Sequence, residues 1–167
     1  MKVLDHFSIP YQGLKNGMHT FHFQVDDTFF TCFESPLVKR GRFEVTLDLD
    51  KRPDMAIASF TMTGAAEVIC DRCLGEFMLP METEFTLHIK YGEGDEADDE
   101  VMFIDTETSK VNFAQPIYEW ICISLPMVKS HEDESECDPE VIARLNGNSD
   151  GDTDTGPFSS LKDLSFE

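Results

Sequence analysis

Basic residues are scarce in this chain, and the shortage limits what it can bind. Its 167 residues contain 13 lysines and arginines against 33 aspartates and glutamates, which gives a formal net charge of −20 at pH 7. A charge of this size repels nucleic-acid phosphates and attracts basic proteins. We therefore expect a basic protein partner and no DNA binding. Direct contact with RNA stays open, because Lys39, Arg40 and Arg42 form one small basic cluster.

Long apolar runs and an export signal are also missing. No stretch approaches the roughly 20 apolar residues that a membrane-spanning helix needs. Residues 1–10, MKVLDHFSIP, carry charges and a proline where a signal peptide would be apolar. The five cysteines are an odd number and argue for reduced thiols rather than a disulfide framework. We expect a cytoplasmic protein that does not associate with membranes.

Motifs of the common catalytic classes are absent from the sequence. It contains no glycine-rich phosphate loop, no H-E-x-x-H and no G-x-S-x-G. Cys122 lies in the apolar stretch YEWICISL, with no histidine near it in sequence to activate a nucleophile. The sequence therefore favours a binding protein over an enzyme.

Alternating apolar and polar residues run through much of the chain and predict strands. The alternation is strictest over 41–53, where Phe43, Val45 and Leu47 share one face. Strands are predicted over 18–25, 41–53, 55–64, 65–73 and 75–91, with an edge strand over 101–105. Residues 40–91 then form an antiparallel meander, and the acidic segment 92–100 is expected to be a solvated hairpin tip.

Helical spacing appears in three places. Asp26 is a plausible N-cap for a short helix that follows it, and Pro139 opens another short helix. The main helix is predicted over 113–124 and ends before Pro126. The predicted fold is α+β: an antiparallel sheet of five to seven strands, open or curled into a partial barrel, with the main helix packed on its open face.

The C-terminal region changes composition and is predicted to be flexible and acidic. We expect a single α+β domain over 1–145 and a disordered linker over 146–157, rich in Gly, Asn, Asp, Ser and Thr. A short amphipathic tail follows over 158–167, with Leu161 and Leu164 at helical spacing. Such a tail either docks on a partner or covers the core of its own chain.

Cys70 and Cys73, in VICDRCLGEF, are the main chemical signal in the sequence. A structural zinc site takes four Cys or His ligands, and this C-x-x-C supplies two of them. His131 and Cys137 are the best candidates for the other two, because they lie close together in a segment otherwise poor in such ligands. No cofactor is certain from the sequence, and zinc is the one that it leaves open.

Two other interpretations of the cysteine pair remain. A redox dithiol needs a lowered thiol pKa, whereas the neighbouring acids Asp71 and Glu76 are expected to raise it. The plainest interpretation is two thiols in a corner between strands, with Gly75 making the turn. Metal ligand, redox dithiol and plain corner all stay open at this point.

Four motifs follow one another in a recognisable order. They are a C-x-R-C followed by an aromatic residue, a helix that runs into Leu-Pro, a His–acidic–Cys stretch, and a closing Pro-Phe-x-x-Leu-x-x-Leu. The residues concerned are Cys70, Arg72, Cys73, Phe77, Leu125, Pro126, His131, Cys137, Pro157, Phe158, Leu161 and Leu164. This order resembles the YceD family of large ribosomal RNA subunit accumulation proteins, over about residues 40–167.

The resemblance implies a non-enzymatic factor of ribosome biogenesis that supports the accumulation of large-subunit ribosomal RNA. Its partners would be large-subunit components or a basic ribosomal protein. Arg72 and Phe77 at the cysteine corner, with Leu161 and Leu164 in the tail, are the predicted interaction residues. Two alternatives remain: a zinc-stabilised protein-interaction adaptor and a thiol oxidoreductase.

Overall fold

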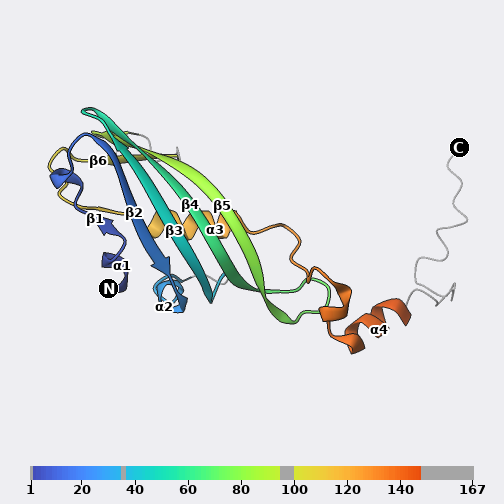
Figure 1. The fold of residues 1–167 in the computed structure, drawn as a ribbon. Coiled ribbons are helices and arrows are strands. Elements are labelled where there is room, and N and C mark those ends of the chain that lie inside the picture. Colours follow the sequence, from blue (N-terminus) through green and yellow to red (C-terminus); the bar gives the residue numbers. More distant parts are fainter. Residues whose placement is uncertain (1, 35–36, 95–99, 148–167) are drawn as a thin grey trace, which may run out of the picture.

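A five-stranded sheet forms the body of the protein (Figure 1). The structure is a computed structural model, and it describes residues 2–34, 37–94 and 100–147. The strands lie in the order β2-β3-β4-β5-β6. Their bounds are Gly17–Val25 for β2, Gly41–Lys51 for β3, Met55–Ile69 for β4, Glu76–Tyr91 for β5 and Val101–Ile104 for β6. The predicted α+β class and antiparallel meander are confirmed, and the sheet stays open, with β2 and β6 at its two edges.

Two details of the strand prediction are wrong. Residues 55–64 and 65–73 are not separate strands, because β4 continues through Gly64 to Ile69. Gly64 is needed there for close approach: a Cβ at this position would lie 2.7 Å from the Cα of Phe43 on the paired strand β3. In addition, β6 pairs with β5 in the parallel sense, so the acidic segment between them does not join the strands of a hairpin.

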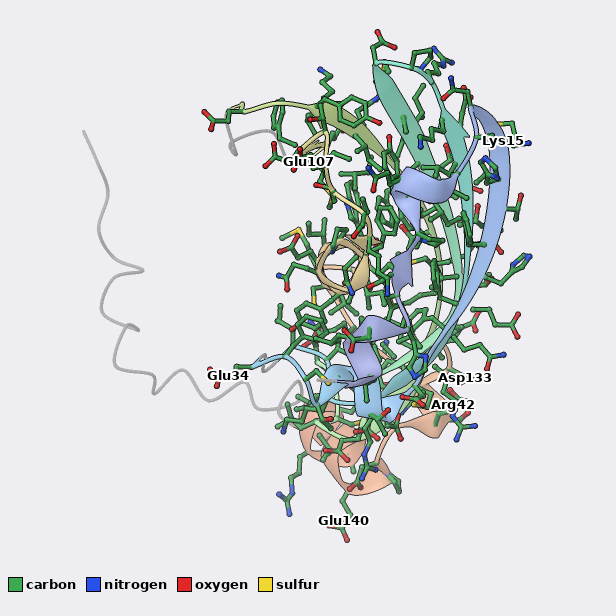
Figure 2. The ribbon with its side chains drawn as sticks, turned by 90° about the vertical axis from the view of Figure 1, so that its left-hand side faces the viewer. Lys15, Glu34, Arg42, Glu107, Asp133 and Glu140 are labelled. Atoms are coloured by element: carbon green, nitrogen blue, oxygen red, sulfur yellow. The ribbon has the colours of Figure 1, made fainter. Side chains whose placement is uncertain are left out.

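The core lies between the sheet and the helix α3, Ala114–Ile123. Seen from the side in Figure 2, α3 lies on the concave side of the bent sheet. The aromatic rings of Phe60 and Phe85 stack with centroids 4.4 Å apart, and Trp120 of α3 stacks on Phe85 at 4.8 Å. The main helix predicted over 113–124 is confirmed to within one residue at each end. The Asn112 side chain accepts a hydrogen bond from the Ala114 N–H (2.9 Å) at its start.

The N-terminal residues pack on the same core rather than on a core of their own. They form α1 (Lys2–Asp5), β1 (Ser8–Ile9), a short 3-10 helix η1 (Tyr11–Gly13) and, after β2, the helix α2 (Asp27–Phe30). β1 pairs with β7 (Val111–Asn112), and Phe7 and Tyr11 are buried in the main core. The segment that holds α3 is thereby tied to the start of the chain.

The C-terminal part of the described chain lies at the far end of the β4–β5 hairpin from β6 (Figure 1). It comprises a 3-10 helix η2 (Glu134–Glu136) and α4 (Pro139–Gly147), the short helix predicted after Pro139. The rest of the predicted linker and the tail with Leu161 and Leu164 lie outside the described residues. Within the described ranges, no helix is long and apolar enough to cross a membrane.

Candidate metal centre

The turn between β4 and β5 places two cysteines on one corner of the sheet. The Leu74 N–H donates to the Cys70 carbonyl (2.8 Å), and the Cys70 N–H donates to the Gly75 carbonyl (2.8 Å). The positive φ that the turn requires, 61°, falls on Leu74 rather than on Gly75 as the sequence suggested. These bonds close a tight turn that holds the buried Cys70 and Cys73 within one small cluster.

The segment that follows α3 crosses this turn and is fastened to it by two hydrogen bonds. The Asp71 N–H donates to the Lys129 carbonyl, and the Lys129 N–H donates to the Asp71 carboxylate, both at 2.6 Å. This fastening brings His131, two residues further on, over the cysteine corner. Sequence reasoning missed Asp71 and Lys129 as positioning residues, since nothing local links positions 58 residues apart.

Cys137 reaches the same corner through η2. The Asp133 carboxylate accepts a hydrogen bond from the Ser135 N–H (2.9 Å) and caps the turn, and the Cys137 N–H donates to the Glu134 carbonyl (3.1 Å). Asp138 then caps α4 by accepting from the Glu140 N–H (2.9 Å). The acids of this segment therefore include two caps, Asp133 and Asp138, which fold the chain back onto the turn.

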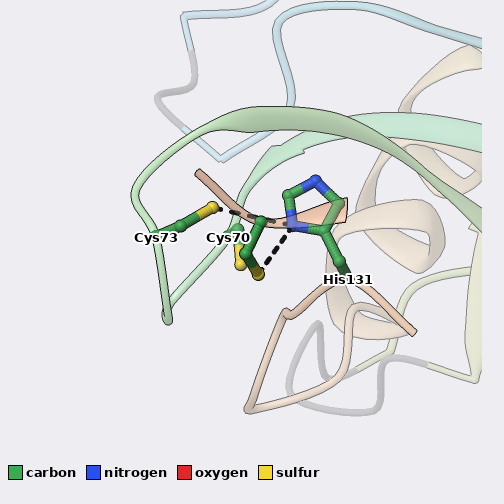
Figure 3. Close-up of side chains that lie close together, drawn as sticks. Cys70, Cys73 and His131 are labelled. Carbon is green, nitrogen blue, oxygen red and sulfur yellow. Dashed lines mark hydrogen bonds between the residues drawn. The ribbon is translucent and has the colours of Figure 1, made fainter. Parts of the chain in front are cut away.

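The four residues predicted as metal ligands converge in the structure. One ligand atom from each of Cys70, Cys73, His131 and Cys137 lies within 4.8 Å of all the others. The His131 Nδ1 lies 3.6 Å from the Cys73 Sγ and 3.4 Å from the Cys137 Sγ. Figure 3 shows Cys70, Cys73 and His131 close together at this corner. The cluster could hold a metal ion.

The two sulfur–nitrogen separations match those of a tetrahedral zinc site. With Zn–S near 2.3 Å and Zn–N near 2.0–2.1 Å, a tetrahedral angle puts sulfur and nitrogen about 3.6 Å apart. A simple S–H···N hydrogen bond would explain one such contact. It does not explain why the sulfurs of both Cys73 and Cys137 lie within 3.6 Å of the same imidazole nitrogen, because that nitrogen can accept only one thiol proton.

The electrostatic surroundings of the cluster favour a thiolate at Cys70. Burial raises the pKa of the Cys70 thiol, but backbone hydrogen bonds from Cys73, His131 and Arg72 outweigh it and lower the pKa from 9.0 to about 6. The expectation that the neighbouring acids would raise it is wrong here, since backbone N–H groups point at the sulfur. Burial, followed by the hydrogen bond with Cys73, raises the pKa of Cys137.

Side chains around the cluster support its ligands. An Arg72 guanidinium nitrogen lies 3.8 Å from the Cys137 sulfur and can donate to it, and the Phe77 ring packs on the His131 imidazole with centroids 4.4 Å apart. Val141 and Ile142 of α4 pack on the cysteines. Arg72 and Phe77 thus contact the cluster itself, and their role toward a partner stays a prediction.

The geometry is that of a closed structural site. The exposed fractions are 0% for Cys70, 7% for Cys73 and 3% for Cys137, which leaves little room for a substrate. Catalytic zinc sites keep one position open for water or substrate, whereas structural sites use four protein ligands. Fold and site together define a small α+β protein whose Cys₃His cluster joins the end of a hairpin to the C-terminal segment.

Comparison with known proteins identifies the family. A family model described as "Large ribosomal RNA subunit accumulation protein YceD" matches residues 58–165, and the chain belongs to this family. The resemblance drawn from the four ordered motifs is therefore confirmed. The comparisons matched no curated protein and no solved structure.

Proposed function

We propose that this protein supports the accumulation of large-subunit ribosomal RNA by binding, without catalysis, in the cytoplasm. Its partner would be a basic ribosomal protein or an assembly intermediate of the large subunit. The observation that carries the proposal is membership of the YceD family over residues 58–165. The family description names an accumulation role, and the acidic character of the chain supports the choice of a basic partner.

Acidic side chains lie on the face of the sheet that α3 does not cover. Glu44 of β3 and Glu82 of β5 flank Thr63 of β4 across the strands. These side chains point away from the core and are exposed. An acidic face on a chain of net charge −20 steers a basic partner toward it and gives an association that weakens with salt.

The test is the ratio of large- to small-subunit ribosomal RNA in cells depleted of this protein, together with sucrose-gradient profiles. We expect a selective fall in large-subunit RNA and in free large subunits, both restored when the intact chain is expressed again. Unchanged RNA and normal gradients in depleted cells would contradict the proposal.

We also propose that Cys70, Cys73, His131 and Cys137 bind one zinc ion with a structural role. Support comes from the four-ligand geometry and from the burial of all three sulfurs. The same burial argues against the thiol oxidoreductase alternative, because Cys70 cannot reach an external disulfide. The zinc-stabilised adaptor without a ribosomal role would give bound zinc together with unchanged ribosomal RNA.

Metal analysis of the purified chain tests the zinc proposal. The intact protein should carry about one zinc ion per chain, as structural sites do, and Cys137→Ser should lose most of it. Cys32→Ser is the matched control, because Cys32 is exposed and lies outside the cluster. Full zinc content in Cys137→Ser, or none in the intact chain, would refute the site.

A further inference from the structure

A second feature lies at the opposite end of β5 from the cysteine cluster. It is a cavity of about 620 Å³ between α3, β6 and the turn that follows β5. Leu87, Phe103 and Trp120 line it together with the carboxylates of Glu93 and Glu119. Leu87 at the cavity lies ten residues along β5 from Phe77 at the cysteine cluster, and at roughly 3.3 Å per residue about 33 Å of strand separates them. The cavity and the cluster are separate sites.

The aromatic wall of the cavity is held by the core. Trp120 stacks on Phe85 at an interplanar angle of 10°, and Phe85 stacks on Phe60 at 4°. Phe103 on the other side lies against Gly94, where a Cβ would run into the phenyl ring. The cavity therefore has a supported aromatic surface before any ligand arrives.

Among the described residues, neither carboxylate at the cavity takes part in an ion pair. One Glu119 oxygen accepts a hydrogen bond from the neutral Gln115 amide (2.6 Å). The ion pairs found among the described residues are Arg40–Glu67 and Arg52–Asp50, and neither includes Glu93 or Glu119. Both glutamates are exposed. Their negative charge is available to a cation from outside.

Beside the cavity, β6 offers a strand edge. It is the last strand in the sheet order and pairs with β5 alone. Among the described residues, its other edge has no strand partner. An extended peptide can add to such an edge through backbone hydrogen bonds while its alternate side chains enter neighbouring pockets.

We propose that this cavity receives an arginine side chain from an extended basic segment that lies along β6. A guanidinium stacks on an aromatic face such as that of Trp120 and pairs with carboxylates such as Glu93 and Glu119. The same two negative charges repel a phosphate group. The inference rests on the proposed function and deepens it: the cavity is where the basic ribosomal partner is recognised.

Trp120 provides a direct readout, because it is the single tryptophan of the chain. The probe is a short synthetic peptide that alternates threonine and valine around one central arginine. Its control carries citrulline, which is neutral and nearly the same shape, in place of the arginine. We expect a saturable change in Trp120 fluorescence with the arginine peptide and at least about tenfold weaker binding of the citrulline peptide, since a charge-assisted hydrogen bond is lost.

Two double variants decide whether the binding belongs to this cavity. The double variant Glu93→Gln, Glu119→Gln should bind the arginine peptide about tenfold more weakly or worse. Calorimetry measures this affinity, so that the signal does not depend on Trp120. Glu82→Gln with Glu84→Gln removes the same charge from the outer face of the sheet and should leave the affinity nearly unchanged. Equal weakening in both variants, equal binding of both peptides, or no binding at all would overturn the inference.

The cellular experiment separates this inference from the function on which it rests. If the Glu93→Gln, Glu119→Gln variant loses peptide binding yet restores ribosomal RNA in depleted cells, the cavity is not the recognition site and the proposed function stands. If depletion itself leaves ribosomal RNA unchanged, the proposed function fails whatever the peptide experiment gives.

Discussion

Some single side chains stabilise the fold through contacts that the alternation of apolar and polar residues does not predict. Lys51 lies on the inward side of β3 and is 8% exposed. Its ammonium donates to the carbonyls of Tyr11 (2.7 Å) and Leu14 (2.9 Å) and lies 4.6 Å from the centre of the Tyr11 ring. Sequence alternation places residue 51 on the buried face, and only its partners explain why a lysine is tolerated there.

Lys51→Met should destabilise the protein by about 2 kcal/mol, because one buried and one part-buried carbonyl then lose their charged donor. Urea unfolding measures the change. Lys15→Met is the control, since Lys15 is exposed and no side-chain bond is seen for it in the described structure. A Lys51→Met variant as stable as the intact chain would show that the carbonyls find other donors.

Asp26 makes a pH-dependent contribution to stability. Its carboxylate accepts from the hydroxyl and N–H of Thr28 and from the N–H of Phe29, and the Thr28 hydroxyl is the main cause of its lowered pKa. Asp26→Ala should cost about 1 kcal/mol at neutral pH, as N-cap losses do. Because the folded-state pKa lies below the ordinary 3.8, this contribution is complete above that value and is lost as pH falls through the folded-state pKa.

Unfolding curves of the intact chain and of Asp26→Ala at several pH values check this prediction. The difference in unfolding free energy between the intact chain and Asp26→Ala should disappear at acidic pH. Asp54→Ala, in the exposed turn after β3, should show no comparable gap. A gap that stays constant down to strongly acidic pH would mean that the cap does not act through its carboxylate.

At the scale of elements, α4 differs from the rest of the fold. α3, β1 and the five-stranded sheet share the main core, whereas the packing found for α4 is through Val141 and Ile142 on the separate cysteine cluster. The attachment of α4 therefore depends on the integrity of that small cluster. It also depends on the two bonds between Asp71 and Lys129.

Removal of zinc by a chelator should release the segment 129–147 while the sheet stays folded, if the cluster binds zinc as proposed. Hydrogen exchange followed by mass spectrometry should then show faster exchange in α4 and unchanged exchange in β3 and β4. Cys70→Ser should behave like the chelated protein, and Cys122→Ser, outside the cluster, should not. Uniform loss of protection in the sheet would mean that the main core also depends on the cysteine cluster, against which Phe77 packs as well as against the main core.

At the scale of the whole molecule, charge and shape act together. The chain has a net charge of −20, and exposed acidic side chains such as Glu44, Glu82 and Glu84 lie on the sheet. The cavity between α3 and β6 lies on the other side of the sheet and would add the specific contact proposed above. On this proposal, long-range attraction accelerates the encounter with a basic partner, and the cavity selects that partner.

Association with a basic large-subunit component should therefore depend strongly on salt. A tagged chain should retain large-subunit components at an ionic strength of about 0.05 M and lose most of them at about 0.5 M, where the Debye length falls to a few ångströms. Quantitative mass spectrometry of the retained proteins measures this. Retention that is equal at both salt concentrations would point to an apolar interface instead.

Local patterns in the chain were sufficient to predict much of the architecture. Two-residue alternation located β2, β3 and β5, and three-to-four spacing located α3 to within a residue, because both periods are properties of neighbouring residues. The acid surplus and the four candidate ligands were likewise evident from composition and spacing. The motif order was enough to point to the family that the comparison confirmed.

Other features depend on contacts between distant positions and were decided by the tertiary structure. His131 and Cys137 meet Cys70 and Cys73 beside the hydrogen bonds between Asp71 and Lys129, and no local period of the sequence predicts contacts between positions this far apart. The parallel pairing of β6, the continuity of β4 through Gly64 and the cavity beside Trp120 arise from elements meeting in space. Periodicity specifies which face of an element is buried, but packing selects its neighbour.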